Sequence, residues 1–92
     1  MSRTVTYTSP EGAKFRFRKP SDIEYAEFQS QASDVETRSK AMRLLIKTCH
    51  EGEPAALEAL LSEYPALVTH DKGIGTQLIK LAGAGLGSFS SD

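Results

Sequence analysis

The chain has 92 residues, of which 39% are hydrophobic and 25% are charged, and its formal net charge is -1. This length suits one hydrophobic core and leaves no room for a second domain. No apolar run approaches the ~20 residues of a membrane span. The near-neutral charge also argues against a dedicated nucleic-acid binder, because such proteins rely on an excess of basic groups.

The start of the chain and its cysteine content both bear on location. The first residues lead directly into an alternating pattern, without the apolar core of a secretory signal, so we expect the chain to stay where it is made. Cys49 is the single cysteine and cannot form an internal disulfide. A lone thiol fits a reducing compartment such as the cytoplasm.

Two short segments near the N-terminus alternate with a period of two. Residues 4–8 alternate threonine with apolar residues, and residues 13–18 include an alternation of basic with aromatic residues. Both patterns predict strands. Residues 9–12 between them contain Pro and Gly, which favour a tight turn, so an antiparallel hairpin is expected. Its apolar face would consist of Val5, Tyr7, Phe15 and Phe17.

Two helices are predicted after the hairpin. Ser21 and Glu24 have the spacing of a capping box, which places a first helix at about residues 22–32. Asp34 offers a new cap, and helical spacing then continues up to His50. The expected inward residues are Tyr25, Phe28 and Ala32 in the first helix, and Val35, Ala41, Leu44, Leu45, Thr48 and Cys49 in the second.

Two further helices complete the predicted fold. One runs from Pro54 to about Tyr64, since Pro suits a first helical position and Pro65 ends the pattern. The last is expected to be capped by residues 69–71 and ended by Gly83. The sequence thus predicts one α+β domain over residues 1–83, an N-terminal β-hairpin followed by three to four short α-helices. Residues 84–92 are glycine-rich and are predicted to form a flexible tail.

Candidates for chemistry are few. Cys49 and His50 are adjacent, and neighbours on a helix diverge by about 100°, so they do not converge as a nucleophile pair. We interpret Cys49 as a buried filler and His50 as a cation at a helix C-terminus. An enzyme centred on Cys49 and His70 is a weaker alternative. Neither these residues nor Asp71 has the spacing of a zinc site, so no catalytic residue, cofactor or metal is predicted.

Other polar motifs have simple structural interpretations. The carboxylates Glu51, Glu53, Glu58 and Glu63 are interpreted as a solvated face, because nothing places them in an apolar pocket. The segment Gly73-Ile74-Gly75 resembles the opening of a phosphate loop, but no strand precedes it. We interpret these glycines as loosening or kinking the start of the last helix.

A basic face on the second strand is the main alternative for function. It consists of Lys14, Arg16, Arg18 and Lys19. Bases interleaved with aromatic residues also occur in single-strand RNA binders. Here the period of two sends the rings and the charges to opposite sides of the sheet. A small nucleic-acid-binding or regulatory module therefore stays the second hypothesis, with nucleic acid disfavoured by the overall charge.

Apolar helix stripes are the preferred candidate for function. Most of their residues are expected in the core, but a partly open groove between helices could accept an amphipathic helix from a partner. The uncovered hairpin edge also leaves room for self-association. The candidate partner-binding residues are Leu57, Leu60, Leu61, Tyr64, Leu67, Ile74, Leu78 and Leu81.

The order of these features resembles the tail assembly chaperones of long-tailed bacteriophages and related prophages. The resemblance rests on residues 15–25, which join a strand to a helix start through Lys19-Pro20, and on residues 44–49. It continues through the patterned stretches 57–67 and 78–83. In all it covers about residues 5–83.

This resemblance implies a non-enzymatic protein of the host bacterial cytoplasm. Such a protein would bind the tape-measure protein, keep it soluble, help recruit tail-tube protein, and be absent from the mature virion. The family often has a longer frameshifted product, and the glycine-rich end would suit a junction to it. No ligand-binding residue is transferred by the resemblance.

Overall fold

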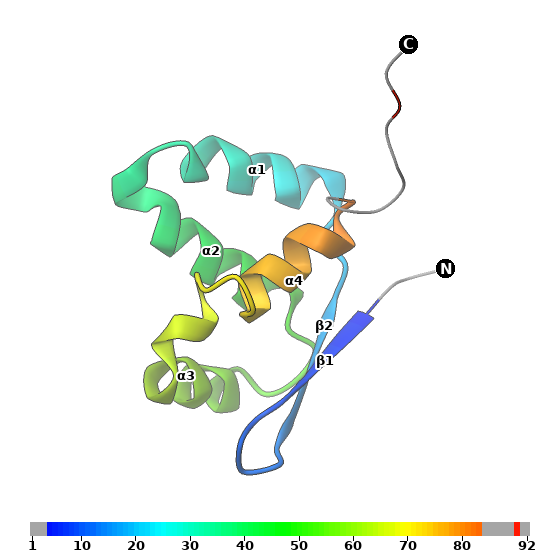
Figure 1. The fold of residues 1–92 in the computed structure, drawn as a ribbon, viewed down its shortest axis with the longest axis vertical. Coiled ribbons are helices and arrows are strands. Elements are labelled where there is room, and N and C mark those ends of the chain that lie inside the picture. Colours follow the sequence, from blue (N-terminus) through cyan, green and yellow to red (C-terminus); the bar gives the residue numbers. More distant parts are fainter. Residues whose placement is uncertain (1–3, 84–89, 91–92) are drawn as a thin grey trace.

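A computed structural model describes residues 4–83 and 90 of the chain. It confirms the α+β class and the order of elements, with an N-terminal hairpin followed by four α-helices (Figure 1). The predicted flexible tail, residues 84–92, lies outside the described residues except for Ser90. The elements are β1 (Thr4–Thr8), β2 (Lys14–Arg18), α1 (Asp22–Ala32), α2 (Val35–Cys49), α3 (Pro54–Glu63), the 3-10 helix η1 (Pro65–Leu67) and α4 (Ile74–Leu81).

The hairpin is antiparallel, as predicted, and has one apolar face. Val5 pairs with Phe17 and Tyr7 with Phe15 across the two strands. Both phenylalanines are buried and their partners are half-buried, so the predicted apolar face is confirmed. Gly12 closes the turn with a φ of 91°, a conformation that side-chain-bearing residues rarely adopt.

The core lies between the inner face of the hairpin and helices α2, α3 and α4. In Figure 1 the helices gather on one side of the hairpin, with α4 between α2 and the strands. The most deeply buried side chains come from β2, α2, α3 and α4. They are Phe17, Ile46, Cys49, Leu57, Leu61 and Leu78.

Helix α2 buries three of the six residues predicted to point inward, and the rest of its buried stripe differs from the prediction. The three are Ala41, Leu45 and Cys49. Met42 and Ile46 are buried, whereas Val35 is 77% exposed and Leu44 is 55% exposed. Thr48 is exposed as well. The helical period predicted for α2 is correct, but its buried face is rotated about the helix axis relative to the prediction. The reason is that α2 packs on β2 and α4 as well as on α1. The predicted inward positions of Val35, Leu44 and Thr48 were therefore wrong.

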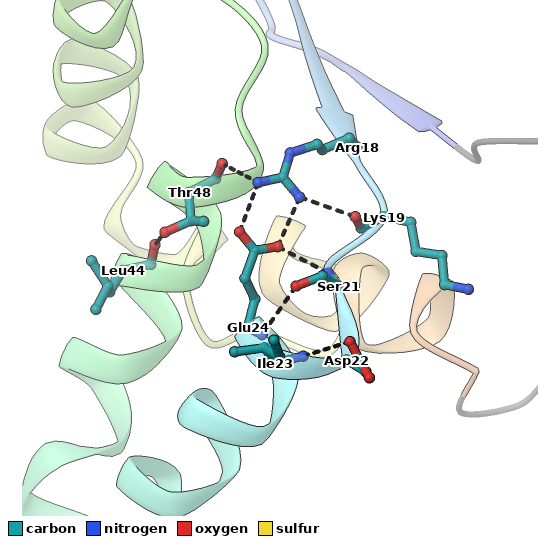
Figure 2. Close-up of polar contacts among 8 residues, drawn as sticks. All are labelled: Arg18, Lys19, Ser21, Asp22, Ile23, Glu24, Leu44 and Thr48. Carbon is teal, nitrogen blue, oxygen red and sulfur yellow. Dashed lines mark hydrogen bonds and ion pairs between the residues drawn. The ribbon is translucent and has the colours of Figure 1, made fainter.

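A polar cluster fixes the start of α1 against β2 and α2. The predicted capping box of Ser21 and Glu24 is present. Arg18 makes two hydrogen bonds of 2.8 Å to the two carboxylate oxygens of Glu24, and it also donates to the carbonyl oxygens of Thr48 and Lys19 (Figure 2). One guanidinium thus joins the end of β2, the start of α1 and the last turn of α2.

The start of α4 differs from the prediction. Its N-cap is Gly73, which offers no side-chain cap, so the predicted capping by residues 69–71 was wrong. A β-carbon on Gly75 would lie 2.5 Å from both the Val68 carbonyl oxygen and the Met42 sulfur, and one on Gly73 would lie 2.4 Å from the Leu67 carbonyl oxygen. These glycines do not loosen the helix. They let it approach the preceding turn and α2 closely.

Candidate protein-binding cleft

The structure divides the eight predicted partner-binding residues into two groups. Five of them are buried in the core and expose little or no surface: Leu57, Leu60, Leu61, Ile74 and Leu78. Tyr64, Leu67 and Leu81 are half-buried and pack against the core. In a domain this small the helix stripes are needed for folding, so any preformed binding surface depends on the second group.

Two of the half-buried residues, Tyr64 and Leu67, line a cleft of about 660 Å³. We call it the η1 cleft. Pro65 ends α3 and begins the 3-10 turn, and the chain then turns again before Gly73, whose N–H donates to the carbonyl oxygen of His70. The complete lining is Tyr7, Glu63, Tyr64, Pro65, Ala66, Leu67, His70, Lys72 and Gly73.

A hydrogen bond to the hairpin holds one wall of the η1 cleft. The Tyr64 hydroxyl donates to Glu11 Oε1 at 2.5 Å, which ties the hairpin turn to the end of α3. This bond raises the pKa of Tyr64 to about 12 and lowers the pKa of the Glu11 carboxyl. The bond thus favours the protonated hydroxyl and the ionised carboxylate, and it connects the wall of the cleft to the hairpin turn.

A second hollow extends the η1 cleft along β1. It has a volume of about 230 Å³ and shares Tyr7, Lys72 and Gly73 with the cleft. Because they share these residues, the two hollows are neighbours, and we call them together the trough. Its remaining lining residues are Val5, Thr6, Phe17, Ile74 and Gln77. Apolar walls with a few charges at the rim suit the apolar side of another polypeptide better than a small polar substrate.

The titratable groups of the η1 cleft include Glu63, His70 and Lys72, and no hydrogen bond or ion pair joins the side chains of these three residues. Exposed His70 accepts a hydrogen bond at Nδ1 from the Lys72 N–H, which is local turn geometry. Cys49 is fully buried, and burial raises its pKa to about 11, so its thiol is far from the reactive thiolate form. Residues 4–83 and 90 contain no group of three or more His, Cys, Asp or Glu that could hold a metal ion.

His50 is not the helix-terminal cation that the sequence suggested. Its ring lies against Phe15 and Phe17, with centroids 6.0 Å and 5.3 Å away. Burial lowers its pKa below the usual 6.5, so the ring is neutral at pH 7. Its backbone also forms an antiparallel bridge with Phe17. Packing against the hairpin, which a local pattern does not reveal, favours the neutral ring.

The predicted basic face is partly neutralised. Arg18 is paired with Glu24, and Arg16 Nε lies 3.5 Å from Glu51 Oε1. Lys14 and Lys19 are exposed. Glu58, interpreted from sequence as solvated, pairs with Arg43 and Lys47. With half of its cations already bound to carboxylates, the face is less suited to phosphate than the sequence indicated.

Sequence reasoning missed Tyr7, Pro65 and Lys72 as members of one cleft. Tyr7 was assigned to the hairpin face and Pro65 to a helix stop, and both assignments hold. The cleft arises because β1 lies beside a turn far along the chain. The spacing of apolar residues along the sequence does not indicate a contact between segments that are far apart in the chain.

In comparisons with known proteins, no family model, no curated protein and no solved structure matches this chain. No helix in the described part of the chain is both long enough and apolar enough to cross a membrane.

Proposed function

We propose that this chain is a non-enzymatic protein-binding domain of the tail-assembly-chaperone kind, which holds an apolar segment of a tape-measure protein during tail assembly. The observation that carries the proposal is the η1 cleft. It combines apolar walls with Tyr64, whose hydroxyl is hydrogen-bonded to Glu11 of the hairpin turn. The choice of a tape-measure protein as the partner rests on the order of sequence features, which resembles that of the chaperone family.

The mechanism is reversible burial of apolar surface. A tape-measure protein exposes long apolar helix stripes before assembly, and such surfaces aggregate when uncovered. Apolar side chains of one stripe would enter the trough against Tyr64 and Leu67, while Lys72 and Glu63 at the rim orient the segment. On this proposal the chain acts in the host cytoplasm, helps recruit tail-tube protein and leaves before the virion is complete.

The test compares one cleft variant with one matched surface variant. Leu67→Asp introduces a charge into the η1 cleft, whereas Leu44→Asp makes the same change on the exposed side of α2. We expect Leu67→Asp to weaken binding to overlapping peptides from a tape-measure protein of the same genome by roughly tenfold or more. Leu44→Asp should bind as the wild type does, with both variants shown to be folded by circular dichroism.

A salt series separates this proposal from the nucleic-acid alternative. Phosphate contacts lose affinity steeply as ionic strength rises, but apolar docking does not. Equal peptide affinity for Leu67→Asp and the wild type would refute the cleft. Tight oligonucleotide binding that weakens steeply with salt, and that is lost in Lys14→Ala, would favour the basic face instead.

A further inference from the structure

The outer edges of the two hairpin strands differ in their backbone hydrogen bonding. The outer edge of β2 is covered by the chain after α2, because Phe17 bridges His50 and the Glu51 N–H donates to the Arg16 carbonyl oxygen at 2.8 Å. The outer edge of β1 has no such cover. Among residues 4–83, no segment makes a backbone hydrogen bond to its outward groups.

The hydrogen-bond pattern identifies which groups point outward. The Ser9 N–H donates to the Ala13 carbonyl oxygen, so this pair next to the strands faces inward. Pairs alternate in an antiparallel ladder, and therefore Tyr7 and Val5 also bond to β2. The backbone groups of Thr4, Thr6 and Thr8 then point away from β2, as those of Arg16 do on the covered edge.

This edge lacks the usual protection against strand pairing. Residues 4–8 contain no charge, no proline and no bulge, and the side chains of Thr4, Thr6 and Thr8 are exposed. Natural edge strands are normally guarded by such features. A two-stranded sheet is also marginal by itself and gains from further strands.

We propose that β1 is a dimerisation edge, on which a second copy of this chain pairs antiparallel so that Thr6 faces Thr6 of the second copy. Thr4 then faces Thr8 of the second copy, and each of these pairs can exchange both N–H···O bonds. Val5 faces Tyr7 of the second copy on the other side of the sheet. Thr–Thr and aromatic–β-branched neighbours are both favourable across strands.

The charges of the basic face do not oppose this register. In the paired sheet the two β2 strands, which carry most of that face, are three strand spacings apart, roughly 14 Å. That exceeds the Debye length of about 8 Å at physiological ionic strength. Arg16 and Arg18 are moreover paired with carboxylates of their own chain. An edge that is uncharged and self-complementary fits its own copy better than a strongly charged strand.

The apolar side of the paired sheet would meet the trough. Val5 and Tyr7 line the hollow beside Ile74, so Tyr7 of the second copy would lie at the mouth of this hollow when it faces Val5. The dimer goes beyond the proposed function and is tested apart from it, because it uses the backbone edge of β1, although Tyr7 of the second copy would border the same trough.

The experiment measures the mass of the full chain by sedimentation velocity over a wide concentration range. We expect the wild type to change from monomer to dimer as concentration rises. Thr6→Pro removes an outward N–H without touching the β1–β2 ladder, and we expect roughly tenfold weaker association. Thr6→Ser keeps the backbone and should dimerise as the wild type does.

A charge-swap pair makes the test independent of how Thr6→Pro folds. Thr6→Lys and Thr6→Glu each place like charges opposite one another at the two-fold axis, so each alone should be monomeric, and an equimolar mixture should dimerise again. In the wild type, amide exchange at Thr6 and Thr8 should slow as concentration rises. A monomer at every concentration, or a dimer that Leu44→Asp disrupts and the Thr6 variants do not, would overturn the proposal.

Discussion

Helices α3 and α4 bury two or more apolar side chains each, whereas α1 buries one and carries a polar cluster at its first turn. Leu61 and Leu78 are completely buried. In α1 only Phe28 is buried, and the helix packs mainly on α2. The Arg18–Glu24 pair and the capping box fix its start instead. Burial therefore supplies most of the stability of one region, and hydrogen-bond geometry sets the position of the other.

Removing a buried leucine from α3 should have the largest effect. Leu61→Ala creates a cavity at a site with 0% exposure, and we expect it to lower the free energy of unfolding by about 3 kcal/mol. Urea denaturation measures this directly. Leu44→Ala, at a site with 55% exposure, is the control and should cost only about 0.5 kcal/mol. Similar losses in the two variants would mean that α3 is not part of the core.

Filling the close approach at α4 should be the next largest change. Gly75→Ala gains helix propensity, but its β-carbon would overlap the Val68 carbonyl oxygen and the Met42 sulfur. We expect a net loss of about 2 kcal/mol in thermal or urea unfolding. In the control Gly52→Ala the nearest atoms belong to the His50 ring, a side chain that can move. A more stable Gly75→Ala protein would contradict the packing described for α4.

The polar attachment of α1 can be broken at Glu24. Glu24→Ala removes both the bidentate pair with Arg18 and half of the capping box, and we expect a loss of about 1–2 kcal/mol at pH 7, since the pair is partly exposed. Faster amide exchange confined to the first turns of α1 would show that the loss is local. Glu27→Ala on the same helix is the matched control, and an equal loss there would contradict a specific role for Glu24.

The same contact predicts an acid-dependent loss of stability. The hydrogen bonds from Arg18 lower the pKa of Glu24 from 4.5 to about 2 in the folded protein. The stabilisation is therefore complete above pH 4.5 and is lost as pH falls from 4.5 to 2. Urea unfolding at several pH values should show this decline in the wild type. Glu24→Gln should show a shallower one, and identical pH profiles would rule out the pair as its cause.

His50 should give the smallest effect, at milder acidity. Because burial lowers its folded pKa below 6.5, the unfolded chain takes up a proton first as pH falls below 6.5, and stability declines. His50→Gln keeps a polar side chain that does not titrate, so its stability should change less between pH 7 and pH 5. A decline of the same size in both proteins would assign it to other groups.

Local patterns predicted the elements well and their packing less well. The period of two in β1 and β2, the capping box at Ser21 and the stop at Pro65 depend on neighbouring residues, and all were readable from the sequence. The rotation of α2, the neutral state of His50 and the need for Gly75 depend on what lies across the fold. For the same reason the sequence suggested Tyr64 and Leu67 as candidates but not the cleft they share with Tyr7.

The hydrogen bond between Glu11 and Tyr64 joins residues 53 positions apart. On a ribosome adding roughly 5–20 residues per second, the hairpin turn is made about 3–10 s before its partner. Until α3 and α4 are made, the apolar face of the hairpin lacks the part of the core that they supply, and apolar surface left uncovered during synthesis favours aggregation.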